Sequence, residues 1–300
     1  MPSSPNTPVL RLAHSPDPDD AFMWWPLFEV DGNPPLLEDP RFRYEPVELD
    51  IETLNAHAEM AQYEITAISC AQYPRVSSQY VITACGASLG DAYGPKVVAR
   101  EPMSVQQLRA LSGPIAIPGV RTSAYGALSL LRHPRPVKYD ILPFEQIIDR
   151  VADGSFEAGV VIHEGQLTFE EAGLHLVVDL GQWWSHETGL PLPLGVNTVR
   201  RDLESRHGTG ALQHIADMLR RSVVAALENR RQSIEYAMRF GRGLDPDRTD
   251  QFVEMYVNAW TLDFGDRGRQ AVRTFLGQLR RAGLVPAFND ADLMVGDPSA

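Results

Sequence analysis

Strand-like and helix-like segments alternate along the first two thirds of the chain, and this alternation constrains the fold more than any other feature. Residues 9–13, 64–69 and 158–162 are short apolar segments typical of strands, whereas residues 104–111 and 122–131 have helical character. Such alternation is typical of parallel sheets whose faces are covered by helices. We therefore expect an α/β fold.

Two lobes are expected because 300 residues exceed the usual size of a single domain. We expect residues 1–100 and 195–300 to form the first lobe and residues 101–194 the second, with a ligand cleft between them. The helical segments beyond residue 210, among them a predicted helix over residues 247–262, should return to cover the first lobe. Residues 190–195, Leu-Pro-Leu-Pro-Leu-Gly, either cross between the lobes, because proline stiffens an extended chain, or form an ordinary surface loop.

The net charge argues against two classes of partner. Lys and Arg number 27 against 39 Asp and Glu, and the formal charge of -12 repels nucleic-acid phosphates and anionic membranes. The first eight residues are polar and lack the basic start and apolar run of a secretory signal. The chain also has no apolar run of the roughly 20 residues that a membrane span needs. We expect a cytoplasmic protein; the sequence does not fix its oligomeric state.

Several common chemistries lack their motifs in this sequence. Cys70 and Cys85 lie in apolar segments and are expected to be buried reduced thiols, and no cluster of Cys and His predicts a metal site. The phosphate-binding patterns GxGxxG and GxxxxGK[ST] and the zinc-binding pattern HExxH are absent. We therefore expect no cofactor and no metal, and a cleft suited to binding or to cofactor-free proton transfer.

His163 is the candidate base. It follows an apolar predicted strand, and ligands of open α/β sheets gather at the carboxyl ends of strands. An imidazole there accepts and releases a proton near neutral pH. The alternative is a hydrogen-bonded structural histidine. Glu164 is either the group that orients this ring or a residue that points to solvent.

Thr122 and Ser123 follow a strand and a Pro-Gly turn, so that two hydroxyls and several backbone amides should converge at a helix start. Such a place attracts anions, and the preceding Arg121 either adds positive charge or faces solvent. The alternative reading of Thr122 is an ordinary helix cap.

Ser69 ends the strand that contains Ala67 and Ile68, the counterpart in the first lobe of the position of His163. It is a candidate hydrogen-bond donor to a ligand, or else a cap for the following helix. Asp19, with its neighbours Asp17 and Asp20, forms a set of carboxylates that either act together or cap and solvate a turn.

At these same segments the chain resembles a family that unites the menaquinone-pathway enzymes of the futalosine route with related solute-binding-like proteins. The segments that carry the resemblance are Gly94-Pro-Lys-Val-Val-Ala-Arg100, Ile117-Pro-Gly-Val-Arg-Thr-Ser-Ala-Tyr125, Gly159-Val-Val-Ile-His-Glu-Gly165, Val178-Asp-Leu-Gly-Gln-Trp-Trp184, Gly189-Leu-Pro-Leu-Pro-Leu-Gly195 and Tyr256-Val-Asn258. The resemblance spans nearly the whole length. It implies the two-lobed periplasmic-binding-protein type II fold, also called the Venus-flytrap fold.

Within that family the chain is most similar to the 1,4-dihydroxy-6-naphthoate synthases. The resemblance implies a lyase that cleaves cyclic dehypoxanthine futalosine, a carboxylated small molecule, without a cofactor. It assigns the base to His163 and ligand contacts to Ser69, Thr122 and Ser123, so we expect the neighbouring Ala67, Ile68, Asp19 and Arg121 to border the same pocket.

Two departures from the family pattern concern the charge of the pocket. The synthases commonly carry lysine where this chain has Ala67, and their Ser-Pro-Cys-Pro-Asn-Asp turn is here Ser-Pro-Asp-Pro-Asp-Asp over residues 15–20. Both changes make a pocket meant for a carboxylate more negative. The alternatives are therefore a non-catalytic binder of a small molecule and, as a second enzyme of the family, a chorismate dehydratase.

Overall fold

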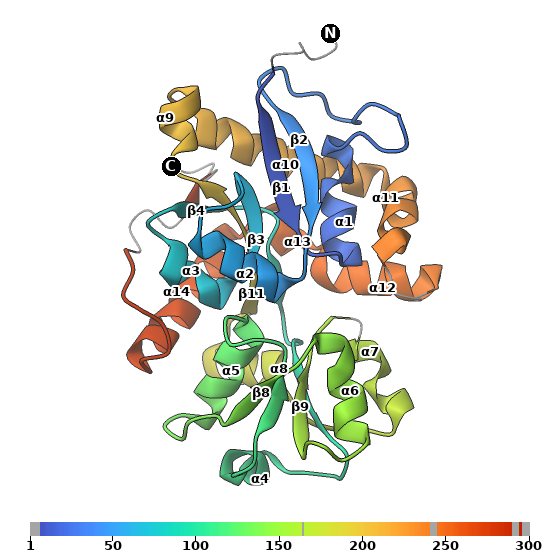
Figure 1. The fold of residues 1–300 in the computed structure, drawn as a ribbon, viewed down its shortest axis with the longest axis vertical. Coiled ribbons are helices and arrows are strands. Elements are labelled where there is room, and N and C mark those ends of the chain that lie inside the picture. The colour runs from blue at the N-terminus through green and yellow to red at the C-terminus, as the bar shows by residue number, and fades with distance from the viewer. Residues whose placement is uncertain (1–6, 164, 241–244, 290–293, 296–300) are drawn as a thin grey trace.

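Two lobes, each with its own β-sheet, make up the computed structural model (Figure 1). The structure describes residues 7–163, 165–240, 245–289 and 294–295. Helices flank both sheets, so the α/β class expected from the alternating segments is confirmed.

The first sheet is mixed, and its strands run in the order β12, β4, β11, β3, β1 and β2, with β5 also paired to β11. The strands are β1 (Val9–His14), β2 (Arg43–Glu48), β3 (Ile65–Ser69), β4 (Tyr80–Thr83), β5 (Ser88–Gly90), β11 (Leu192–Arg200) and β12 (Met294–Val295). β1 pairs in parallel with β2 and β3, whereas β11 runs antiparallel to β3 and β4. All residues of β3 are buried, which agrees with its central place between β11 and β1.

The second sheet has the order β10, β6, β9, β7 and β8. Its strands are β6 (Lys96–Ala99), β7 (Ile115–Ile117), β8 (Tyr139–Ile141), β9 (Ala158–Val161) and β10 (His175–Asp179). The sequence boundary at residue 100 placed β6 in the first lobe, but β6 pairs with β9 and β10. An apolar strand does not reveal from its own sequence which sheet completes its hydrogen bonds.

The chain passes between the lobes twice in this part of the sequence. It enters the second lobe between β5 and β6, and it returns between α8 (Leu180–Thr188) and β11. The proline-punctuated residues 190–195 therefore lie at the return crossing and at the start of β11. Leu190 and Leu192 are buried, which excludes the ordinary surface loop as their description.

Helices of the first lobe come from both ends of the chain. They are α1 (Pro18–Trp24), α2 (Ile51–Glu59), α3 (Tyr73–Val76), α9 (Leu203–His207), α10 (Ala211–Glu228), α11 (Arg230–Ala237), α12 (Pro246–Tyr256), α13 (Ala259–Leu262) and α14 (Gly265–Arg281). Leu12 of β1 shares one hydrophobic cluster with Ile215 of α10 and Val253 of α12. The helices beyond residue 210 thus cover the first sheet, as Figure 1 shows.

The single helix expected over residues 247–262 is wrong, because the structure has two helices there, α12 and α13. Asn258 interrupts them: its side chain accepts a hydrogen bond from the backbone of Trp260, and the hydroxyl of Thr261 accepts one from the backbone N–H of Asn258. This reciprocal cap starts a new helix in a new direction. The helices of the second lobe are α4 (Val105–Ala110), α5 (Ser123–Arg132), α6 (Phe144–Ala152), α7 (Gly165–Thr168) and α8.

Two further expectations concern the thiols and the membrane. Cys70 and Cys85 are free and buried, as expected. Within the described ranges, no helix combines the length and the apolar character that crossing a bilayer requires.

Candidate active site

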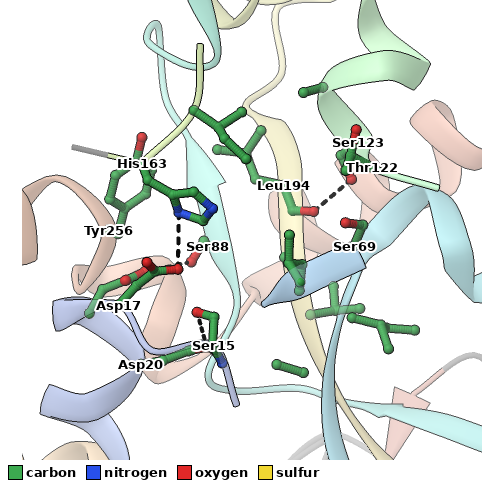
Figure 2. A pocket seen from close by; sticks show the side chains of 18 of the residues that line it. Ser15, Asp17, Asp20, Ser69, Ser88, Thr122, Ser123, His163, Leu194 and Tyr256 are labelled. Atoms are coloured by element: carbon green, nitrogen blue, oxygen red, sulfur yellow. Dashed lines mark hydrogen bonds and ion pairs between the residues drawn. The ribbon is translucent and has the colours of Figure 1, made fainter. Parts of the chain in front are cut away.

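A cavity of about 750 Å³, including the part open to solvent, lies where the two lobes meet (Figure 2). The first lobe contributes the end of β3, the turn before α1 and part of β11. The second lobe contributes the start of α5 and the end of β9. The carboxyl ends of strands thus meet from both sides, as expected for an α/β ligand site.

The end of β3 forms one wall of the cavity through Ala67, Ile68 and Ser69. Asn55 of α2 fixes the position of Ser69 twice: its Oδ1 accepts from the backbone N–H of Ser69 at 2.8 Å, and its Nδ2 donates to Ser69 Oγ at 3.1 Å. Because Asn55 already donates to this hydroxyl, Ser69 Oγ keeps its own proton to donate elsewhere. The residue does not cap the following helical turn with its side chain.

Thr122 and Ser123 also line the cavity, but both hydroxyls make bonds within the protein. Thr122 Oγ1 donates to the carbonyl of Gly119 at 2.8 Å and accepts from the backbone N–H of Tyr125 at 3.1 Å, so Thr122 is the N-cap of α5. Ser123 Oγ donates to the carbonyl of Leu194 at 2.6 Å. The capping interpretation of Thr122 is therefore correct, and it holds together with a place in the cavity wall.

His163 reaches the cavity directly after β9, in a backbone conformation that few residues other than glycine adopt. Its φ is 55°, in the left-handed region, where strain is typical of functional positions. The ring packs edge-on against Phe144 with 4.6 Å between centroids. Its Nδ1 lies 3.0 Å from Oδ2 of Asp17, and the other ring nitrogen points away from Asp17 toward the cavity (Figure 2). Glu164, considered as the orienting group, lies outside the described residues.

Asp17, Asp19 and Asp20 stand at the start of α1 and are all buried, which excludes the solvated turn considered from the sequence. Asp19, the residue expected to cap a helix starting near Asp20, lies inside α1 instead, and Asp17 at the N-cap position makes no capping bond with its side chain. Asp20 accepts hydrogen bonds from the backbone N–H of Ser15 at 2.9 Å and from its hydroxyl at 2.8 Å. Asp19 accepts from the Ser88 hydroxyl at 3.4 Å.

Burial shifts the protonation of two of these acids. Desolvation, joined by the neighbouring carboxylates of Asp20 and Asp17, raises the pKa of Asp19 well above its ordinary value, although His163 opposes the shift. Desolvation also raises the pKa of Asp20, against His14 and the hydrogen bonds from Ser15. Both shifts favour the protonated, uncharged forms of these two acids.

Arg121 does not reach this cavity. Its guanidinium Nε donates to Glu59 at 2.8 Å and Nη1 donates to Glu52 at 3.1 Å, both on α2 of the first lobe. Among the described residues that line the cavity there is no Lys or Arg. The described residues also contain no group of three or more His, Cys, Asp or Glu side chains arranged to hold a metal ion.

The structure adds residues to the cavity wall that were not singled out from the sequence. Gln166 donates from Nε2 to the Tyr256 hydroxyl at 2.7 Å, and both side chains are buried. Asn197 of β11 donates to the carbonyl of Gly86 at 2.6 Å. Tyr256 lies in a segment that carries the family resemblance, which was the one signal available. Gln166 and Asn197 gave none.

A family model described as menaquinone biosynthesis matches residues 10–281, almost the whole described chain. The chain belongs to this family. Two relatives support the assignment, and both are named 1,4-dihydroxy-6-naphthoate synthase. The Thermus thermophilus protein is 40% identical over 92% of this chain and 96% of its own length. The Streptomyces coelicolor protein is 36% identical over 93% of this chain and 96% of its own length.

Two solved structures are similar to this chain in their fold. A crystal structure of a protein from Archaeoglobus fulgidus superposes with a TM-score of 0.82 at 38% identity, and covers 92% of this chain and 98% of that one. The alkanesulfonate-binding protein of Xanthomonas axonopodis, bound to MOPS, gives a TM-score of 0.68 at 11% identity, with 97% and 98% covered. The second likeness shows the fold alone. The two-lobed periplasmic-binding-protein fold expected from the resemblance is confirmed.

Proposed function

We propose that the protein is a 1,4-dihydroxy-6-naphthoate synthase, a lyase that cleaves cyclic dehypoxanthine futalosine with His163 as the general base. The observation that carries the proposal is the position of His163: its ring lies at the cavity between the lobes, with one nitrogen against a buried carboxylate and the other directed to the cavity. The names of the two relatives, which are 36% and 40% identical to this chain, support 1,4-dihydroxy-6-naphthoate as the product, and the substrate is the one that the family resemblance implies.

The proposed step is a retro-aldol-like cleavage. His163 Nε2 takes the proton of a substrate hydroxyl, whose oxygen becomes a carbonyl as the adjacent carbon–carbon bond breaks. The electron pair of that bond passes to the dihydroxynaphthoate fragment, which takes up a proton, and the sugar-derived fragment leaves with the new carbonyl. Since no electrons are gained or lost overall, the step needs no oxidant or reductant.

Substrate binding is assigned to the polar groups of the two walls. Asn55 holds Ser69 Oγ in place, and this hydroxyl donates a hydrogen bond to the ligand. Thr122 and Ser123 accept hydrogen bonds from the ligand with their remaining oxygen lone pairs, and the start of α5 faces the same cavity. Ala67 and Ile68 supply an apolar surface for the ring system. Asp19 in its protonated form donates a hydrogen bond to the substrate carboxylate, where an ionised Asp19 would repel it.

Turnover of the proposed substrate tests the function. Purified protein mixed with cyclic dehypoxanthine futalosine should release dihydroxynaphthoate, detected by chromatography, and His163→Ala should lower kcat by about 100-fold or more. His214→Ala is the matched control, because His214 also pairs with a buried aspartate, Asp39, but lies away from the cavity. Release of product at the wild-type rate by His163→Ala would exclude His163 as the base.

A non-catalytic small-molecule binder is the second candidate, favoured by the cavity wall that lacks Lys and Arg among its described residues. If the protein is a binder, its melting temperature should rise in the presence of a metabolite that is recovered unchanged. A metabolite at a hundredfold excess over its dissociation constant adds about 2.7 kcal/mol to the free energy of unfolding. Offering chorismate in the same assay tests the dehydratase, whose product would appear in place of dihydroxynaphthoate.

A further inference from the structure

We propose that Asp17 is a positioning residue for His163, and that this pair, with one partner from each lobe, makes the base competent only while the cleft is closed. The inference rests on the proposed function in one respect, the role of His163 as base. It adds the residue that sets the tautomer of the ring and links that tautomer to the arrangement of the lobes.

The contact is short and shielded from water. Asp17 Oδ2 lies 3.0 Å from His163 Nδ1, and the two side chains are 3% and 15% exposed. A carboxylate in this environment is desolvated and interacts strongly with a donor in hydrogen-bond contact. The left-handed φ of His163 and the T-shaped contact with the Phe144 ring hold the imidazole in this orientation. The ring is thus held in place at its backbone and at one side.

The chemistry of the ring follows from this contact. A carboxylate oxygen accepts a hydrogen bond, so Nδ1 must carry the proton, and Nε2 then presents a lone pair to the cavity. That is the tautomer a general base needs. The carboxylate also stabilises the imidazolium that forms when Nε2 has taken the substrate proton. Asp19, the other acid near the ring, bonds to Ser88 instead and is favoured in its protonated form.

The partners come from different lobes. Asp17 sits between β1 and α1 of the first lobe, and His163 follows β9 of the second. Figure 2 shows the dashed contact between them at one side of the cavity. Separation of the lobes removes the carboxylate from Nδ1 and leaves the tautomer undetermined. Closure therefore assembles the base at the moment when the substrate is enclosed.

The test combines nitrogen NMR of the histidine rings with steady-state kinetics. In the wild type we expect His163 to show a protonated Nδ1 and an unprotonated Nε2. In Asp17→Asn the amide can donate to Nδ1 and so favour the opposite tautomer, and in Asp17→Ala the ring should show a mixture. For both variants kcat should fall on the order of 100-fold or more, with KM changed by less than about fivefold.

Asp39→Asn is the matched control, because it disrupts the other buried Asp–His pair, in which Asp39 lies 2.9 Å from His214, without touching the cavity. It should leave the His163 resonances and kcat unchanged. The proposal is overturned if the His163 tautomer is the same in wild type and Asp17→Ala, or if Asp17→Asn keeps the wild-type kcat. If the wild type fails to cleave the substrate, the proposed function fails, and the NMR result still decides the role of Asp17.

Discussion

Asp19 occupies a position where its ionised form is disfavoured. The side chain is buried at the start of α1, and Asp20 and Asp17 are its neighbours. The raised pKa of Asp19 means that, between its ordinary value and the raised one, the folded protein binds a proton that the unfolded chain has released. Stability therefore falls as pH rises through that window.

Asp19→Asn should remove this dependence. At pH above the raised pKa the variant should be more stable than the wild type, by on the order of 1 kcal/mol, because an amide carries no charge to desolvate or repel. Below the ordinary pKa of aspartate the two proteins should differ much less. Urea unfolding at about pH 3, 6 and 8 measures the difference.

The control for Asp19→Asn is Asp153→Asn. Asp153 is exposed, and the hydrogen bonds from Ser155 lower its pKa, the opposite direction. Its replacement should give no gain in stability at high pH. An Asp19→Asn effect of equal size at about pH 3 and about pH 8 would contradict an electrostatic cause.

At the scale of residues, the sequence indicated His163, Ser69 and Thr122 because each stands directly after a strand or at a helix start. The partner of His163 could not be found in the same way. The contact of Asp17 with the ring depends on how the two lobes are placed, and no local pattern encodes a distance between segments so far apart in the chain. Arg121 was expected in the cavity for its charge alone, but two glutamates of α2 bind it.

Thr122 couples the start of α5 to the cavity wall. Thr122→Ala removes the cap of Tyr125 N–H and the bond to Gly119, and we expect the free energy of unfolding to fall by about 1 kcal/mol, whereas Thr122→Ser should retain most of it. Ser104→Ala is the matched cap variant, because Ser104 caps α4 outside the cavity. Denaturant unfolding checks both.

Activity separates the two caps. Ser104→Ala should lose stability and keep its turnover, whereas Thr122→Ala should also raise KM by removing a ligand contact. Equal KM values in the two variants would show that Thr122 acts only as a helix cap and not as a ligand contact.

At the scale of elements, hydrophobic periodicity predicted most strands and helices because their buried faces are apolar. This periodicity failed to predict the end of a helix where a tertiary contact determines it. The hydroxyl of Thr261 shares its proton between the carbonyls of Tyr256 at 2.8 Å and Ala87 at 3.2 Å, and the contact with Ala87, which is distant in the sequence, helps to fix the break between α12 and α13. Residues 257 and 258 are compatible with a helix, so the sequence alone shows no interruption.

The arrangement of the whole molecule depends on contacts that join the lobes. In the described parts of the chain, side-chain ion pairs do so at three places: Asp17 pairs with His163 inside the cavity, Arg121 of the second lobe with Glu52 and Glu59 of the first, and Arg248 of the first lobe with Glu171 of the second. The hydrogen bond from Arg121 lowers the pKa of Glu59, so that this pair stays charged at neutral pH. The two lobes could be predicted from the chain length and the alternation of strands and helices. The lobe to which β6 belongs could not, because it depends on which strands pair with β6.

Arg121→Ala should shift the lobes toward separation. Partly exposed ion pairs contribute only about 0–1 kcal/mol each, so we expect a small loss of closure: KM should rise by about two- to fivefold while kcat at saturating substrate stays near the wild-type value. Small-angle scattering of the ligand-free variant should show a larger radius of gyration. The radius of gyration of the wild type should also increase in high salt, because screening weakens partly exposed ion pairs.

Arg43→Ala is the control for Arg121→Ala. It breaks an exposed ion pair with Glu45 inside the first lobe and should change neither KM nor the radius of gyration. If Arg121→Ala lowers kcat and leaves the radius of gyration unchanged, Arg121 acts on the chemistry and not on the closure of the lobes.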